Sequence, residues 1–172
     1  MDALVVIDVQ QGLFSMPQYP PYDGEAVVER IARLVGAARA GGTPVLYVQH
    51  AGGEGDPLNM SKPGFAFRPE LAPQASESVT VKRQPSAFED TTFDETLQQA
   101  GVDHLVICGM ETDCCVNATV RAAAERGYRV SLVSDAHTTA GNGQDPPAEI
   151  IAQHNAALGE VAKLVTSTEL VF

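Results

Sequence analysis

Short apolar runs rich in β-branched residues recur along the chain, and segments with helical periodicity separate several of them. The six runs are Ala3–Val9, Pro44–Gln49, Ser78–Lys82, His104–Cys108, Arg129–Ser134 and Ala162–Val165. Most are apolar at consecutive rather than alternating positions, which is typical of strands buried on both faces of a parallel sheet. No other feature of the chain limits its possible folds as strongly.

The helical segments between the runs have apolar residues at three- and four-residue spacing. We expect them to begin near Gly24 after a capping Asp23, after a capping Thr92, near Cys115, and after Pro146 and Pro147. Strands that alternate with helices predict right-handed crossovers, and hence an α/β fold with helices on both faces of a mainly parallel sheet. The length of 172 residues, without a repeat or linker, predicts one domain over residues 1–172.

The charge of the chain limits its partners. Lys and Arg number 11 and Asp and Glu number 22, so the formal net charge is −11. Nucleic acids and anionic membrane surfaces are bound through clustered Lys and Arg, so we expect neither as a partner. The apolar stretch Leu4–Ile7 near the N-terminus is too short for a signal peptide or a membrane span, and we expect it to be a core strand.

Three cysteines are present, Cys108, Cys114 and Cys115. The odd number and the absence of a paired C-x-x-C spacing argue against a disulfide framework and a zinc site. We therefore expect reduced thiols and a cytoplasmic protein. Cys108 lies inside an apolar run and is expected in the core.

Chemically useful side chains follow four of the predicted strands: Asp8, His50, Lys82 and, after a short polar turn, the cysteine pair. In open α/β sheets, ligands bind outside the carboxyl ends of the strands. A cysteine at a helix N-terminus is favoured as a thiolate, and nearby N–H groups can hold an oxyanion. The alternative is that both cysteines are small buried hydrophobic residues, and spacing does not choose between Cys114 and Cys115.

A nucleophilic thiol needs a base. Of the four histidines, His104 begins a strand and His154 lies within a helix, so neither is an obvious candidate. Asp8 can take the proton if it is close to the thiol and partly desolvated, since desolvation raises the pKa of a carboxyl group. Lys82 would then balance the charge.

Taken in order, several motifs resemble the isochorismatase-like family of cysteine hydrolases, which includes nicotinamidases and carbamoylsarcosine amidases. The resemblance covers essentially the whole chain. It rests on Asp8-Val9-Gln10, Lys82 with Ser86-Ala87-Phe88, residues 109–116, Gly127-Tyr128 and Asp135-Ala136. Any one piece is weak, but the ordered set at these strand ends is specific.

The resemblance implies a three-layer αβα fold with a six-stranded parallel sheet of order 3-2-1-4-5-6. It also implies a catalytic triad of Asp8, Lys82 and Cys115, and an oxyanion hole formed by the backbone N–H groups of Glu111 and Cys115. Family members have a cis peptide bond in the turn before the cysteine, which corresponds to Met110–Glu111. A homodimer or homotetramer is implied as well.

Possible pocket residues lie on segments near these strand ends: Gln10, Phe14, His50, Phe65, Phe88 and His137. Each could equally pack in the core or in a loop, and Gln10 could support Asp8 from behind. The segment from His50 to Pro73, rich in glycine and proline, is either a binding loop or a surface excursion packed by its own aromatic residues.

Nicotinamidases in this family hold a metal with an Asp and several histidines around the second strand. Here only His50 stands there, so we expect no metal and no cofactor. The sequence thus predicts a hydrolase that cleaves an amide, lactam or ureido carbon–nitrogen bond of a small molecule through a thioester. The alternatives are a thiol redox protein and an inactive relative that binds small molecules.

Overall fold

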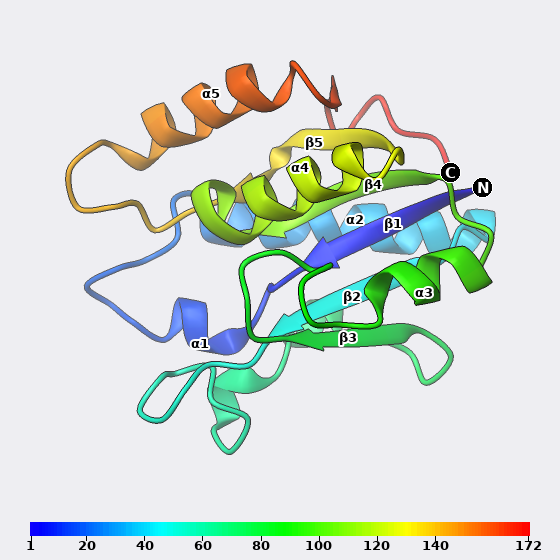
Figure 1. Cartoon of the computed structure of the whole chain (residues 1–172). Coiled ribbons are helices and arrows are strands. Elements are labelled where there is room, and N and C mark those ends of the chain that lie inside the picture. The colour runs from blue at the N-terminus through cyan, green and yellow to red at the C-terminus, as the bar shows by residue number, and fades with distance from the viewer.

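A six-stranded, all-parallel sheet forms the centre of the protein in a computed structural model that describes all 172 residues (Figure 1). The strand order is β3-β2-β1-β4-β5-β6, so the order 3-2-1-4-5-6 implied by the family resemblance is confirmed. The strands are β1 (Asp2–Ile7), β2 (Val45–His50), β3 (Ser78–Lys82), β4 (His104–Met110), β5 (Arg129–Thr138) and β6 (Lys163–Val165).

Helices cover both faces of the sheet, which gives the three layers expected (Figure 1). The helix α2 packs on one face, while α3, α4 and α5 supply buried residues to the other. The α-helices are α1 (Gln11–Phe14), α2 (Gly24–Gly41), α3 (Phe93–Gln99), α4 (Asn117–Glu125) and α5 (Pro147–Leu158). No helix is both long and apolar enough to cross a membrane.

The central strand β1 shows why the apolar runs do not alternate. Val5 and Ile7 belong to the core cluster beneath α3 and α4, whereas Leu4 and Val6 belong to the cluster beneath α2. Successive side chains of a strand point to opposite faces, and here both faces are buried. A run of consecutive apolar residues therefore predicts a central parallel strand correctly.

The structure corrects several predicted element ends. The fifth strand continues to Thr138 instead of ending at Ser134, because an irregularity between Ile107 and Gly109 brings the last residues of β4 opposite the end of β5. Neither Asp23 nor Thr92 forms a side-chain cap, although α2 and α3 begin directly after them.

The helix predicted from Cys115 is split into two elements. One turn of π-helix, η3 (Thr112–Val116), contains both adjacent cysteines, and α4 begins after it. Single turns of π-helix are rare in proteins, and those that exist are often found at functional sites.

The long segment between β2 and β3 contains two short 3₁₀ helices, η1 (Pro63–Phe65) and η2 (Pro69–Leu71). The buried Gln10 side chain ties this segment to the sheet. Its amide nitrogen donates to the carbonyl oxygens of His50 and Phe65, at 3.0 and 2.8 Å, and its oxygen accepts from the N–H of His50. These bonds fix the segment beside the carboxyl ends of β1 and β2.

Candidate active site

The carboxyl ends of β1, β3 and β4 bring the three residues of the predicted triad together. The ammonium nitrogen Nζ of Lys82 lies 2.8 Å from Oδ2 of Asp8 and 3.1 Å from Sγ of Cys115. The side chains of Lys82 and Asp8 are 0% and 2% exposed, and Cys115 is 9% exposed. One buried cation therefore contacts both a carboxylate and a thiol.

Asp8 reaches this position through an unusual backbone conformation. Its φ angle is +51°, in the left-handed region, where Asp and Asn are the most tolerated residues after glycine. Its N–H still donates to the carbonyl oxygen of Val48, so β1 remains attached to β2 up to the point where the chain turns. The carboxyl oxygen Oδ1 is buried and receives no hydrogen bond from the protein.

The turn that carries Cys115 begins at Gly109, whose φ angle is +128°. A Cβ atom there would overlap the backbone of Ile7 in the neighbouring strand, so only glycine lets β4 pass so close to β1. The peptide bond between Met110 and Glu111 is cis. The η3 turn follows and places Cys115 opposite Asp8 and Lys82.

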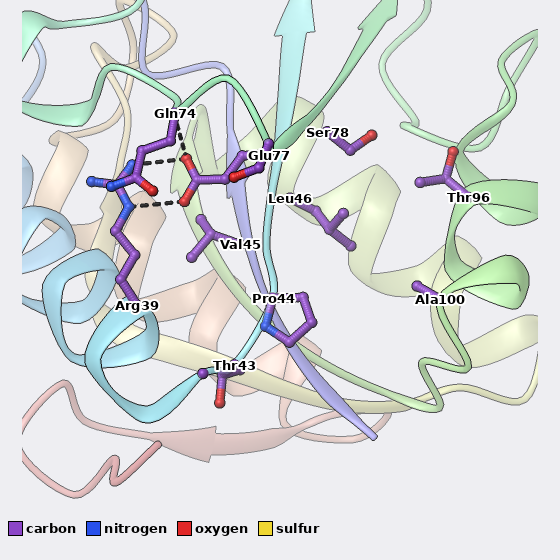
Figure 2. Close-up of a pocket in the computed structure, with 12 residues that line it drawn as sticks. Arg39, Thr43, Pro44, Val45, Leu46, Gln74, Glu77, Ser78, Thr96 and Ala100 are labelled. Atoms are coloured by element: carbon purple, nitrogen blue, oxygen red, sulfur yellow. Dashed lines mark hydrogen bonds and ion pairs between the residues drawn. The ribbon is translucent and has the colours of Figure 1, made fainter.

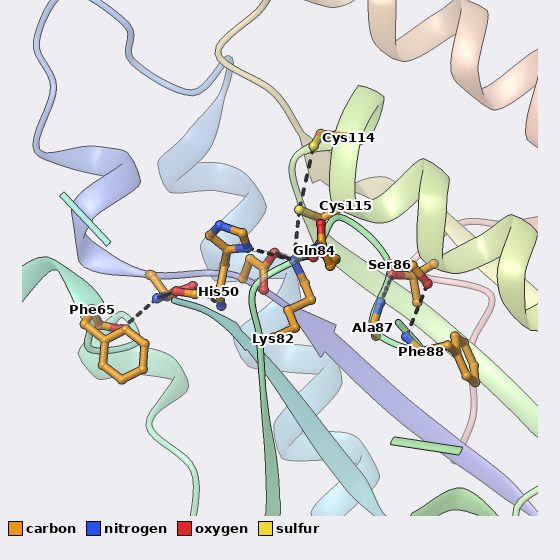
Figure 3. A network of polar contacts seen from close by, with 12 residues as sticks. His50, Phe65, Lys82, Gln84, Ser86, Ala87, Phe88, Cys114 and Cys115 are labelled. Carbon is orange, nitrogen blue, oxygen red and sulfur yellow. Dashed lines mark hydrogen bonds and ion pairs between the residues drawn. The ribbon is translucent and has the colours of Figure 1, made fainter. Parts of the chain in front are cut away.

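The ammonium of Lys82 has four acceptors around it, and Figure 3 shows it close to His50, Gln84 and Cys115. Besides Asp8 and Cys115, its ammonium lies 3.2 Å from Nδ1 of His50 and 3.1 Å from the carbonyl oxygen of Gln84. An ammonium has donors only, so Nδ1 of His50 must be an acceptor. The imidazole is therefore neutral, and its pKa is lowered by burial and then by the charge of Lys82. His50 is a poor general base for this thiol.

Burial and mutual charge shift the pKa values of all three residues. The pKa of Asp8 is raised well above its usual range, first by burial and then by Cys115, while Lys82 opposes the shift. Burial alone would lower the pKa of Lys82, but the negative charges of Asp8 and Cys115 outweigh it and raise that pKa. The pKa of Cys115 is raised by Cys114 and by burial. Lys82 is thus favoured in its charged form, and both Asp8 and Cys115 hold a proton more readily than they would in water.

The three cysteines lie in different environments. Cys108 is fully buried in β4, as expected, and burial raises the pKa of its thiol. Cys114 is exposed, its sulfur lies 3.9 Å from that of Cys115, and this contact lowers its pKa to about 7. Of the three cysteines, only Cys115 contacts Lys82.

A cavity of about 170 Å³ opens onto the triad. Pockets for small molecules usually measure about 300–1,000 Å³, so the space beside the thiol is small. The lining residues are Asp8, Leu13, His50, Leu58, Pro85, Glu111, Cys114 and Cys115. The combination of a thiol, a carboxylate and a buried cation beside a cavity is suited to attack on an electrophilic carbon.

Comparison with known proteins identifies the family. A model of the isochorismatase domain matches residues 2–168. The chain belongs to the isochorismatase family. A streptothricin hydrolase of Streptomyces noursei is 36% identical over 139 residues, which are 81% of this chain and 55% of that protein. This isochorismatase-family chain therefore spans about half the length of that relative.

Two further family members are similar over most of the chain. A ureidoacrylate amidohydrolase of Variovorax paradoxus is 32% identical over 170 residues, which cover 78% of this chain and 67% of that protein. The crystal structure of an isochorismatase from Pseudomonas putida superimposes with a TM-score of 0.92 and 35% identity. It covers 99% of this chain and 90% of that one, so the two share the whole fold.

Of the six side chains predicted for the pocket of this family member, only His50 lines the cavity. Phe14 instead stacks under the guanidinium of Arg68, 4.5 Å from its ring centre. Phe88 packs in the core against Phe93, with ring centres 5.0 Å apart. Both aromatic rings were expected near the site because they lie on segments close to it, but Phe14 packs against Arg68 and Phe88 packs in the core.

Phe65, His137 and Gln10 also lie outside the cavity. The ring of Phe65 borders a separate groove, and its carbonyl oxygen is the acceptor for Gln10. His137 is buried behind the nucleophile turn, where Nδ1 pairs with Thr112 at 2.8 Å and Nε2 pairs with Asn155 at 3.0 Å. Gln10 supports the loop rather than the carboxyl group of Asp8.

The cavity includes residues that the sequence did not point to, namely Leu13, Leu58 and Pro85. Leu13 lies in the four-residue helix α1 and Leu58 in a turn of the loop after β2, so no periodic pattern singles out either residue. Pro85 lies three residues after Lys82, and that proximity to a predicted catalytic residue was the one available indication.

Asp8, His50 and Cys115 are also the one group of side chains with metal-ligand character in the structure. Their ligand atoms lie within 4.8 Å of one another. The ammonium of Lys82 lies within 3.2 Å of all three, so it occupies the place that a cation would take. The donor set is therefore already matched by a positive charge from the chain itself.

A larger cavity, of about 420 Å³, lies at the opposite end of the strands (Figure 2). It is bordered by the start of β2 and by the ion pair of Arg39 with Glu77, at 2.8 Å. Both charged groups are already paired with each other, and no cysteine, lysine or histidine lines the space. This cavity offers no chemistry comparable to that around Cys115.

Proposed function

We propose that the protein is a cysteine hydrolase that cleaves an amide, lactam or ureido carbon–nitrogen bond of a small molecule. The observation that carries this proposal is the position of the Lys82 ammonium within hydrogen-bond distance of both Asp8 and Cys115. The names of two relatives, a ureidoacrylate amidohydrolase and a streptothricin hydrolase, support the same reaction class.

The first half of the reaction forms a thioester. Asp8 takes the proton of the Cys115 thiol, and the thiolate attacks the carbonyl carbon of the substrate. This transfer moves a negative charge from the carboxylate to the sulfur, and Lys82 contacts both groups, so the buried site stays balanced in charge. The tetrahedral intermediate collapses when Asp8 returns the proton to the leaving nitrogen, and ammonia or an amine departs.

Backbone N–H groups of Glu111 and Cys115 are the proposed donors to the oxyanion. The N–H of Glu111 donates to no acceptor within the protein, so it is free to bind a substrate oxygen. In the second half of the reaction, Asp8 activates a water molecule. The water attacks the thioester, the carbon–sulfur bond breaks, and the thiol regains its proton.

A panel of small primary amides, lactams and ureido compounds, assayed by release of ammonia or amine, tests the proposal. Cys115→Ala should abolish turnover and leave the fold intact, whereas the matched Cys114→Ala variant should keep most of the activity. The acyl-enzyme should appear as a mass increase on Cys115 that hydroxylamine removes. Turnover in Cys115→Ala equal to that of the wild type would exclude the mechanism.

The same assays separate the alternatives. A thiol redox protein would reduce peroxides with a thiol donor and hydrolyse none of the panel. An inactive relative would bind panel members without product formation. The sulfur of Cys115 is held by a lysine and a carboxylate, which favours the hydrolase over both.

We also infer, from the family resemblance, that the protein acts in the cytoplasm and is a homodimer or homotetramer. The three free cysteines are compatible with a reducing compartment. Light scattering on the purified protein measures the assembly directly, and a monomer at micromolar concentration would contradict this part of the proposal.

A further inference from the structure

The charges that line the active-site cavity do not cancel. The carboxylate of Asp8 is matched by Lys82 at 2.8 Å, and His50 is neutral because its Nδ1 accepts from that lysine. Apart from the two cysteines, the one other lining residue with an ionisable side chain is Glu111. Asp8 and Lys82 neutralise each other, so Glu111 is the one acidic residue of the cavity whose side chain has no basic partner.

Glu111 is fixed in place and still has acceptor capacity. Its Oε1 accepts the backbone N–H of Ala140, at 3.1 Å, so the loop after β5 holds the side chain. No protein group donates to Oε2, and that oxygen is not among the buried atoms that lack a partner. Burial raises the pKa of Glu111, and the bond from Ala140 opposes this shift. The oxygen Oε2 of Glu111 is thus free to accept a hydrogen bond from a ligand.

The remaining walls contain no basic group that could hold an anion. They are formed by the apolar side chains of Leu13, Leu58 and Pro85. The basic residues in the neighbouring loops are turned to other partners: Lys62 donates to the carbonyl oxygen of Gly55, and Arg83 contacts Met60. A substrate carboxylate would lose its hydration here and meet only a second carboxylate.

We propose that Glu111 is a specificity-determining residue that selects substrates carrying an ammonium or similar cationic N–H donor near the scissile bond and disfavours anionic ones. This inference rests on the proposed hydrolase function and assigns the substrate class of the same site. Because the backbone N–H of Glu111 is a proposed donor to the oxyanion, its side chain would act on a cationic group within a few bonds of the carbonyl. An ionised hydrogen-bond pair of this kind discriminates by about tenfold or more.

Three amides of nearly equal size test the selection directly. β-Alaninamide, butyramide and succinamate differ only in an ammonium, methyl or carboxylate group at the same carbon. We expect kcat/KM to fall in that order, with at least about tenfold between the first and the last. Equal values, or a preference for succinamate, would overturn the assignment of Glu111 while leaving the hydrolase function in place.

The variant Glu111→Gln is the sharpest probe, because a Gln oxygen can still accept from Ala140 while the charge is lost. It should reduce the preference for β-alaninamide about tenfold, mainly through KM. Asp113→Asn is the matched control, since it removes a carboxylate from the same turn that does not line the cavity. An equal effect of both variants would show a general field of the acidic protein rather than a specific contact.

A second measurement does not depend on turnover. In a Cys114→Ser background, Cys115 can be modified by methanethiosulfonates that carry an aminoethyl, methyl or sulfonatoethyl group. The thiolate forms a mixed disulfide and methanesulfinate leaves. The aminoethyl reagent should react faster than the sulfonatoethyl reagent by about tenfold or more, and Glu111→Gln should lower this ratio.

The two measurements separate the two proposals. If no amide is hydrolysed but the ratio of modification rates depends on Glu111, the charge selection stands and the proposed reaction fails. A ratio that does not change in Glu111→Gln overturns the selection, whatever the amides do.

Discussion

The ammonium of Lys82 lies 2.8 Å from the carboxylate of Asp8, and both side chains are almost completely excluded from solvent. Two buried charges cost several kcal/mol each to remove from water, and each stabilises the other only while both are present. The pair is therefore both a structural element at the carboxyl ends of β1 and β3 and the proposed source of catalytic charge balance.

Lys82→Met should abolish turnover and destabilise the protein by about 3–5 kcal/mol at neutral pH, because Asp8 is left as an unpaired buried charge. Adding Asp8→Asn removes that charge and should recover most of the stability, although not the activity. Denaturant unfolding of the wild type, both single variants and the double variant measures the coupling. If the loss of unfolding free energy in the double variant equals the sum of the losses in the two single variants, the two residues act independently.

Asp8→Asn should lower kcat by about 10²–10⁴-fold in the folded protein, and it should also cost stability because the buried ammonium of Lys82 loses its carboxylate partner. Asn is isosteric with Asp and tolerates the left-handed φ of +51°, so the variant removes the base without backbone strain. Asp8→Ala is the poorer variant because Ala strains this conformation. Circular dichroism and thermal melting verify the fold, and an active Asp8→Asn enzyme would contradict the role of Asp8 as the base.

The pH profile of kcat/KM should have its acid limb well above the ordinary pKa of about 3.9 for an aspartate. The pKa of Asp8 is raised by burial and by Cys115. Protonation removes the base, so activity falls as pH decreases through that raised value and is retained above it. The limb reports the proton shared by Asp8 and Cys115 rather than either residue alone. An acid limb near pH 4 would contradict this coupling.

Cys114 should react with iodoacetamide faster than Cys115 in the absence of substrate. Its thiol is exposed and its pKa is lowered to about 7 by the neighbouring sulfur, whereas the pKa of Cys115 is raised. Peptide mapping after brief alkylation identifies the modified residue. Alkylation in the Cys114→Ser variant then measures Cys115 alone, and exclusive early labelling of Cys115 in the wild type would refute the order.

The sequence places Asp8, Lys82 and the turn that carries the cysteines near one another because each ends or follows a buried strand, whereas the choice of Cys115 comes from the family resemblance. Asp8 and Lys82 lie at the ends of apolar runs, and a parallel sheet brings such ends to one edge. The cavity walls are a different case. Leu58 reaches the site because Gln10 ties the long loop to β2, and no local pattern encodes a hydrogen bond across 40 or more residues.

Errors in the predicted elements have local physical causes. The fifth strand was predicted too short because its last residues are polar, yet they pair with β4 after the irregularity at Gly109. His137 lies on that extension, so it is buried among hydrogen-bond partners instead of facing the substrate. One unrecognised bulge therefore accounts for both the strand end and the misplaced histidine.

The buried chain from Thr112 through His137 to Asn155 should make stability depend on pH. Asn155 donates its amide N–H to the carbonyl oxygen of Ser134, so its Oδ1 accepts from Nε2 of His137. Nδ1 is then unprotonated and accepts from the hydroxyl group of Thr112. The imidazole is held neutral, and burial lowers its pKa.

In the unfolded chain a histidine gains its proton near pH 6.5, above the lowered pKa of His137 in the fold. The unfolded state therefore binds more protons below that pH, and the free energy of unfolding should decrease as pH falls from 7.5 to 5.5, by at most about 1.4 kcal/mol per pH unit for this residue. His137→Gln removes the titration, so its cost should be smaller at pH 5.5 than at pH 7.5. Urea unfolding at both values measures this, and an equal cost at the two pH values would rule out the neutral, hydrogen-bonded imidazole.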